Sequence, residues 1–190
     1  MTIKLKNINK VFDDKIILKD INLSFEDNRI SCIVGPSGCG KTTLLNIILG
    51  ILKADCGEVE GRNGRRIAAV FQEDRLCEEF TAYANLKLVC DDKDSDKVIH
   101  EHLEHVDLKE AAFQKVSYLS GGMKRRVAIV RAVIAKSDII IMDEPFKGLD
   151  EKTKVKVIDY VKRYTKEKIV IITTHNLDEI NMLKATLVQM

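Results

Sequence analysis

The stretch that decides the fold of this 190-residue chain is Gly35-Pro36-Ser37-Gly38-Cys39-Gly40-Lys41-Thr42-Thr43. It fits the pattern G-x-x-x-x-G-K-[ST], which is typical of a loop that wraps around phosphate groups. Residues 30–34 before it are mostly apolar and β-prone, and residues 42–49 after it carry paired apolar positions at helical spacing. The sequence therefore predicts a strand, a glycine-rich loop and a helix in direct succession.

This succession aims backbone N–H groups and a helix N-terminus at one point, where they can hold a triphosphate. Gly35, Gly38 and Gly40 allow the tight curvature and the close approach of the backbone. We expect Lys41 to reach the β- and γ-phosphates and the Thr42 hydroxyl to bind Mg²⁺. All nine residues of the loop are therefore candidate nucleotide contacts.

Composition excludes several other classes of protein. The net charge is +2, so no strong electrostatic partner and no direct contact with nucleic acid is expected. The short basic clusters at 62–66 and 124–126 are expected to be solvated faces. The five cysteines are an odd number without a C-x-x-C pair, which predicts a reduced, cytosolic chain. No apolar run approaches the roughly 18 residues of a membrane helix, so a partner must provide any link to a membrane.

Hydrophobic periodicity predicts strands at 3–8, 21–25, 30–34, 67–71, 139–142, 169–174 and 185–189, and a hairpin at 57–64. It predicts helices at 42–49, 81–90, 95–106 (with Ser95 as its cap), 121–135 and 152–166. Continuous apolar strands that alternate with helices indicate a parallel sheet covered on both faces. We therefore expect one α/β domain over 1–190, with a nucleotide-binding core (1–71 and 120–190) and an inserted helical subdomain (72–119).

A second chemical element ends the apolar strand at 139–142. Asp143 and Glu144 follow this strand directly, so they should lie at the carboxyl edge of the sheet, beside the phosphate loop. Asp143 would hold Mg²⁺ through water, and Glu144 would polarise the water that attacks the γ-phosphate. His175 follows the strand at 169–174 and should reach the same edge, although a lone histidine there is more often structural or solvated.

Ser120, Gly121 and Gly122 open the helix at 121–135 and could form a second anion site. One chain cannot easily use two such sites on one triphosphate, but a two-fold dimer can. On composition alone the three residues are equally a good helix start. His100, His102 and His105 invite a zinc interpretation, but they spread around the helix, which favours a solvated helix.

Taken together, these elements resemble the ATP-binding cassette (ABC) ATPases over nearly the full chain and in the family's order. The matching segments are Phe12 (adenine stacking), 35–43 (Walker A), Gln72 (Q-loop), 119–123 (signature), 139–144 (Walker B), Leu149-Asp150 (D-loop) and His175 (switch). The resemblance implies a P-loop NTPase with a mostly parallel core sheet and an N-terminal antiparallel β subdomain. It implies ATP and Mg²⁺ as cofactors, Thr42, Gln72 and Asp143 as metal-site residues, and Glu144, His175, Gln72 and Lys41 as the catalytic set.

The resemblance further implies the ATPase subunit of a membrane transporter, which dimerises around two ATP molecules and drives an integral membrane permease. Such a subunit is cytoplasmic and peripheral at the inner face of the membrane, and an extracytoplasmic substrate-binding protein can belong to the same system. Residues 70–76, 119–123 and 143–146 look like the nitrate/sulfonate/taurine importer branch, which implies import of a small anion. The alternative is a soluble ABC ATPase that acts on nucleic acid or ribosomes.

Three residues depart from the family pattern. Met123 and Arg125 stand where most members have glutamine, although this branch often has methionine at the first position. Lys147 stands at a usually small D-loop position. The segment between the phosphate loop and Gln72 also looks shorter than usual. These departures leave the details of the expected subunit interface open.

Overall fold

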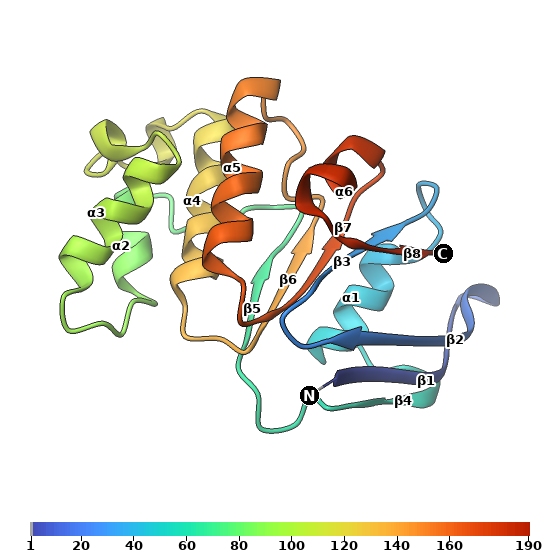
Figure 1. Ribbon diagram of the computed structural model, residues 1–190. Helices are drawn as coiled ribbons and strands as arrows, with labels where there is room; N and C mark the ends of the chain where they lie inside the picture. The colour runs from blue at the N-terminus through green and yellow to red at the C-terminus, as the bar shows by residue number, and fades with distance from the viewer. Residues whose placement is uncertain (1) are drawn as a thin grey trace.

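The computed structural model describes residues 2–190, which form two sheets with helices around them (Figure 1). The larger sheet is five-stranded and parallel, with the strand order β5-β6-β7-β3-β8. Its strands are β3 (Ile30–Val34), β5 (Ile67–Val70), β6 (Ile139–Asp143), β7 (Ile169–Thr173) and β8 (Thr186–Gln189). The predicted α/β fold with a parallel core sheet is confirmed.

Helices cover both faces of this sheet, so every residue of β6 and β7 is buried. On one face, Ile139 and Ile141 pack in a core shared with α1 (Lys41–Leu49). On the other face, Ile140 and Met142 pack in a core shared with α4 (Gly121–Ile134) and α5 (Glu151–Tyr164). The apolar run at 139–142 therefore reflects a strand that has no solvent-facing side.

The smaller sheet is antiparallel, with the order β2-β1-β4 (β1 Thr2–Phe12, β2 Lys15–Glu26 and β4 Cys56–Glu60). It packs on α1, which is enclosed between the two sheets. The hairpin expected at 57–64 is wrong, because β4 pairs with β1, from the far N-terminal end of the chain. A Cβ at Gly61 would lie 2.2 Å from the Thr2 carbonyl oxygen, so these two segments approach too closely for any side chain there.

The inserted block contains α2 (Ala82–Lys87), α3 (Ser95–His105) and two single 3₁₀ turns (Lys109–Ala111 and Val116–Tyr118). Its helices pack on α4, and Figure 1 shows them at the opposite end of the molecule from the antiparallel sheet. Ser95 is not the cap of α3: Asp94 holds that position, and Ser95 is the first helical residue. The short helix α6 (Leu177–Leu183) was not predicted. The boundaries 72 and 119 of the helical subdomain stay a prediction.

Candidate nucleotide site

The predicted phosphate loop connects β3 to α1 and ends at Gly40, which caps the helix with a left-handed φ of 99°. A Cβ there would lie 2.8 Å from Cδ2 of Leu18, so the position needs glycine for both reasons. Lys41 Nζ donates hydrogen bonds to the carbonyl oxygens of Gly35 (2.8 Å) and Pro36 (2.9 Å). The ammonium group therefore lies over the loop, where the phosphates of a nucleotide would bind.

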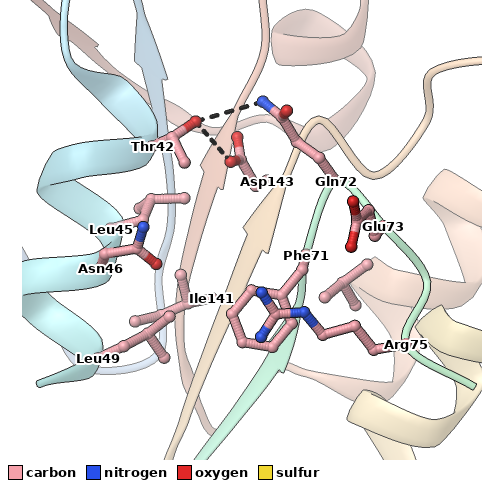
Figure 2. Close-up of a pocket in the computed structure, with 11 residues that line it drawn as sticks. Thr42, Leu45, Asn46, Leu49, Phe71, Gln72, Glu73, Arg75, Ile141 and Asp143 are labelled. Carbon is pink, nitrogen blue, oxygen red and sulfur yellow. Dashed lines mark hydrogen bonds between the residues drawn. The ribbon is translucent and has the colours of Figure 1, made fainter. Parts of the chain in front are cut away.

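Three predicted metal-site residues meet beside this loop, at the carboxyl edge of the sheet (Figure 2). The Thr42 hydroxyl donates to Oδ2 of Asp143 over 2.7 Å, and the Gln72 amide nitrogen donates to Thr42 Oγ1 over 3.3 Å. Hydroxyl, carboxylate and amide oxygens are the ligands that Mg²⁺ prefers. The donor set of this chain therefore fits a bound Mg²⁺ ion.

Sequence reasoning missed Thr173, which orients the same carboxylate. Its hydroxyl donates to Oδ1 of Asp143 over 2.5 Å, so both oxygens of this buried carboxylate are held by threonine hydroxyls. Asp143 and Thr173 are register partners in the parallel pair β6-β7. The available signal was that two neighbouring apolar strands each end in a polar residue.

Glu144 lies one residue beyond the metal-site carboxylate, with a left-handed φ of 47°. Its N–H donates to the carbonyl oxygen (3.2 Å) and the hydroxyl oxygen (3.0 Å) of Thr173. Lys147 Nζ donates to one of its carboxylate oxygens over 3.0 Å, and His175 Nδ1 lies 3.7 Å from the other. The structure therefore places Glu144 and His175 close together at the carboxyl edge of the sheet, with Lys147 beside them.

The electrostatic surroundings keep the Glu144 carboxylate ionised. Burial is the largest single influence and raises its pKa. The hydrogen bond and charge of Lys147, with the charges of His175 and Lys41, together outweigh burial, so the net pKa lies below its ordinary value. An ionised carboxylate at this edge can accept a proton from a water molecule.

A cavity of about 220 Å³ opens over the phosphate loop. Its lining contains the exposed Phe12, Lys41 and Thr42 at the start of α1, and Gln72 and Glu144. A second cavity of about 220 Å³ lies between α1 and β5, and it shares Thr42 and Gln72 with the first (Figure 2). Most predicted site residues thus surround one hollow, with the phosphate loop as its floor.

The predicted signature residues are not at this hollow. Neither of the two cavities is lined by Ser120, Gly121 or Gly122, among the residues that the structure describes. The Ser120 hydroxyl accepts the N–H of Met123 over 3.3 Å, so it is the N-cap of α4. Within residues 2–190, a Cβ on Gly121 would meet no atom within 4 Å. In one copy of the chain, the phosphate loop and the start of α4 are therefore two separate candidate half-sites.

The basic clusters expected to be solvated faces are partly built into the fold, so that prediction is wrong for three arginines. Arg125 is buried and donates to the carbonyl oxygens of Phe71 and Gln72. Arg126 donates to the carbonyl oxygen of Val106 over 2.6 Å. Arg62 Nη1 donates to the Ile47 carbonyl oxygen in the last turn of α1 over 3.3 Å. A guanidinium group can satisfy several orphan carbonyl groups, which charge counting does not reveal.

The prediction of a solvated helix is incomplete for α3, which carries His100, His102 and His105. His102 Nδ1 lies 2.7 Å from the Tyr160 hydroxyl, and its ring centroid lies 4.3 Å from that of Tyr164 on α5. Burial is the main cause that lowers the pKa of His102 to about 4. His105 also packs edge-on against Tyr164, with the ring centroids 5.4 Å apart. These two histidines join the helical block to the core helix α5.

Comparison with known proteins agrees with this geometry. Residues 18–147 match the family described as ABC transporter. The chain is 34% identical over 205 residues to the bicarbonate transport ATP-binding protein CmpD of Synechococcus elongatus, covering 98% of this chain and 74% of that protein. It is 37% identical over 172 residues to the aliphatic sulfonates import ATP-binding protein SsuB 2 of Pseudomonas syringae, covering 90% of this chain and 74% of that protein.

Solved structures give the same result. The dimeric structure of MJ0796, described as a bacterial ABC transporter cassette, superposes with a TM-score of 0.84 at 31% identity, covering 95% of this chain and 90% of that one. The same cassette has also been solved as a post-hydrolysis dimer bound to ADP and Pi. Within residues 2–190, no helix combines the length and the apolar character needed to cross a membrane. This chain belongs to the ABC transporter family, as an ATP-binding cassette that hydrolyses ATP.

Proposed function

We propose that two copies of this chain enclose two ATP molecules with Mg²⁺ and power a membrane permease that imports a small anion. The observation that carries this proposal is the division of the site in one chain. Lys41, Asp143 and Glu144 surround the phosphate loop, whereas Ser120 and the two glycines after it lie elsewhere. A complete site then needs the signature residues of a second copy.

Within each copy, the phosphate loop binds the triphosphate through its backbone N–H groups and Lys41. Thr42, Gln72 and Asp143 would hold Mg²⁺, which would supply positive charge to neutralise the phosphates. Glu144 accepts a proton from the attacking water, and its ionised state suits that task. His175, whose Nδ1 lies 3.7 Å from this carboxylate, donates to the γ-phosphate from the same edge of the sheet. Phe12, 43% exposed at the rim of the cavity, stacks on the adenine ring.

In the dimer, Ser120, Gly121 and Gly122 of one copy cap the γ-phosphate bound by the other copy. The exposed start of α4 supports this role, because the backbone N–H groups of a helix N-terminus favour an anion. The solved relative described above is likewise a dimer. Closure around ATP and reopening after hydrolysis then form the two-state motion that the permease uses.

The names of the relatives support the transport role, since they are transport and import proteins for bicarbonate and for aliphatic sulfonates. We therefore favour a small anion as cargo, such as bicarbonate, nitrate, a sulfonate or taurine. The chain would lie at the cytoplasmic face of the membrane, and an extracytoplasmic substrate-binding protein would deliver the anion. The exposed apolar side chains of the helical block give the permease a docking surface: Phe80, Leu88, Phe113 and Tyr118. No relative named above supports the alternative of a soluble ATPase on nucleic acid.

Cross-linking in the source cells tests this proposal, with the captured partners identified by mass spectrometry. We expect one multi-spanning membrane protein in stoichiometric amount. The variant Leu88→Ser/Phe113→Ser should lose this partner while the purified variant keeps its ATP hydrolysis, because neither side chain lines the cavity over the phosphate loop. A matched control is Val155→Ser, which removes an exposed apolar side chain of α5 and should keep the partner. Ribosomal or nucleic-acid partners without a permease would overturn the transport role.

A further inference from the structure

Arg125 of α4 holds the backbone of the segment that follows β5. Its Nη1 donates to the Phe71 carbonyl oxygen over 2.6 Å, and its Nη2 donates to the Gln72 carbonyl oxygen over 2.5 Å. Nη1 also lies 3.2 Å from Oδ1 of Asp74. The residue is only 8% exposed. A buried guanidinium group needs this full set of partners, so its position and that of the segment determine each other.

Arg131, six residues further along α4, extends the same contact. Its Nη2 donates to the Asp74 carbonyl oxygen over 3.0 Å, and its Nη1 donates to the Arg75 carbonyl oxygen over 2.8 Å. The two arginines together therefore bind four carbonyl oxygens within five consecutive residues. We call Arg125 and Arg131 the arginine clamp. Such a contact ties this loop to the helix rather than leaving it as a free hinge.

The clamp lies between the two half-sites. On one side, Gln72 is held by its backbone, and its side-chain amide reaches Thr42 Oγ1 over 3.3 Å in the metal site. On the other side, α4 begins at Gly121, only four residues before Arg125 and directly after the Ser120 cap. A helix is rigid over that distance, because its backbone hydrogen bonds are continuous. A shift of the signature residues must therefore move the backbone of Gln72 as well.

We infer that Arg125 is a positioning residue for Gln72: it fixes the metal-site glutamine to the helix that carries the signature residues. This inference rests on the proposed function, in which Gln72 helps to hold Mg²⁺. With α4 in the position that it has in this structure, the Gln72 amide donates to Thr42 Oγ1. A movement of α4 would carry the Gln72 backbone, and with it the amide, away from Thr42. Glutamine, which most family members have at position 125, has fewer donors and a shorter reach, so it cannot hold both carbonyl groups in the same way.

A double-mutant cycle with Gln72 tests the inference. Arg125→Gln and Gln72→Ala should each lower kcat and raise the Mg²⁺ concentration for half-maximal ATP hydrolysis, by roughly tenfold. Binding of a fluorescent ATP analogue without Mg²⁺ should stay unchanged in both. The double variant should be no worse than Gln72→Ala alone, because Arg125 acts through Gln72. Arg125→Lys, which keeps the charge but not the fork, provides a milder variant if Arg125→Gln does not fold.

Arg126→Gln is the matched control. It is the next residue of α4, but its guanidinium group binds the carbonyl oxygens of Val106 (2.6 Å) and Asp107 (3.2 Å). If Arg126→Gln lowers the rate of hydrolysis at all, it should do so independently of Gln72. The fold-change of the double variant Arg126→Gln/Gln72→Ala should then equal the product of the two single fold-changes. The positioning role is overturned if Arg125 variants lower only thermal stability. It is also overturned if the fold-changes of Arg125→Gln and Gln72→Ala in kcat multiply in the double variant. If Gln72→Ala itself leaves the Mg²⁺ dependence unchanged, the proposed metal site fails, and the positioning role fails with it.

Discussion

The phosphate loop and the start of α4 both present a helix N-terminus, but their surroundings differ. Around the loop, the chain itself supplies an ammonium group (Lys41), a carboxylate held by two threonines (Asp143) and a second carboxylate (Glu144). At the start of α4, the side-chain contacts include the cap bond of Ser120, the ion pair of Lys124 with Glu78 and the bond from Arg126 Nε to the Gly122 carbonyl oxygen. The first helix start therefore lies in a nearly complete site, and the second is exposed to solvent.

The difference shows that the residues proposed for hydrolysis and the residues proposed to close the dimer lie on different elements of the fold. The residues that we propose as catalytic, Glu144 and His175, lie just beyond β6 and β7, which are buried on both faces and cannot shift without loss of the core. The signature residues lie at the start of a helix that also contacts α2 and α3 of the helical block. A partner that moves the helical block can thus shift the second half-site while Asp143 and Glu144 stay in place, and Gln72, which Arg125 ties to α4, would follow the movement.

The largest expected effect is that of Glu144→Gln, which should stop ATP hydrolysis but not ATP-dependent dimerisation. Glu144→Gln removes the proton acceptor, so we expect kcat to fall by about 10²–10⁴-fold while ATP still binds. Because the product is not formed, the two half-sites should stay joined, and light scattering should find a dimer in Mg²⁺ and ATP. Lys41→Ala is the control, since it should lose both hydrolysis and the dimer. A Glu144→Gln chain that stays monomeric at saturating ATP would contradict a homodimer.

The next effect concerns the link between the helical block and α5. The pKa of His102 is about 4 in the folded chain against an ordinary value of 6.5, so the unfolded chain binds the proton more strongly. Below pH 6.5, the free energy of unfolding should therefore fall, by about 1–2 kcal/mol on reaching pH 5. His102→Gln should remove this part of the pH dependence in urea unfolding. Its kcat at pH 7 should match that of the unchanged chain, since His102 lies in the helical block.

Two helix caps give a direct comparison of a functional and a structural helix start. Ser120 and Thr81 each accept a backbone N–H at the start of a helix, over 3.3 and 3.0 Å. Replacement of either by Ala should lower the free energy of unfolding by about 1 kcal/mol. Only Ser120→Ala should also weaken the ATP-dependent dimer of Glu144→Gln. Equal dimer affinity in both variants would remove Ser120 from the second half-site.

The smallest effect concerns Lys147, whose ammonium group is largely exposed. Its ion pair with Glu144 should contribute less than about 1 kcal/mol to stability. It also helps to lower the pKa of Glu144, so Lys147→Ser should raise that pKa. The acidic limb of the pH profile of kcat should then move to higher pH, because the carboxylate becomes protonated earlier. A profile that does not move would show that Lys147 acts elsewhere, for example at the subunit interface.

Local patterns were enough to predict the centre of this protein. The phosphate loop, its strand and its helix are contiguous, and Asp143 and Glu144 directly follow a buried strand. Each of these features depends on a few neighbouring residues: glycines for curvature, apolar runs for burial, a helix start for phosphate. The parallel order of the sheet followed from the alternation of strands and helices. The role of Gln72 came from the resemblance to a family, and the same resemblance favoured the functional roles of Ser120 and His175 over the structural alternatives that the residues alone left open.

What the sequence did not determine was the choice of distant partners. Residues 57–64 read as a hairpin, but β4 pairs with β1 instead. Arg125 read as a solvated charge, but it is buried against two carbonyl groups, and His102 is packed against the tyrosines of α5. A pattern along the chain reports whether a residue suits burial or exposure on average. The hydrogen-bond partner of a buried polar side chain is decided only when the sheets and helices pack. Such a side chain must bond to a group that the tertiary structure brings within reach, because a buried polar group without a partner is costly.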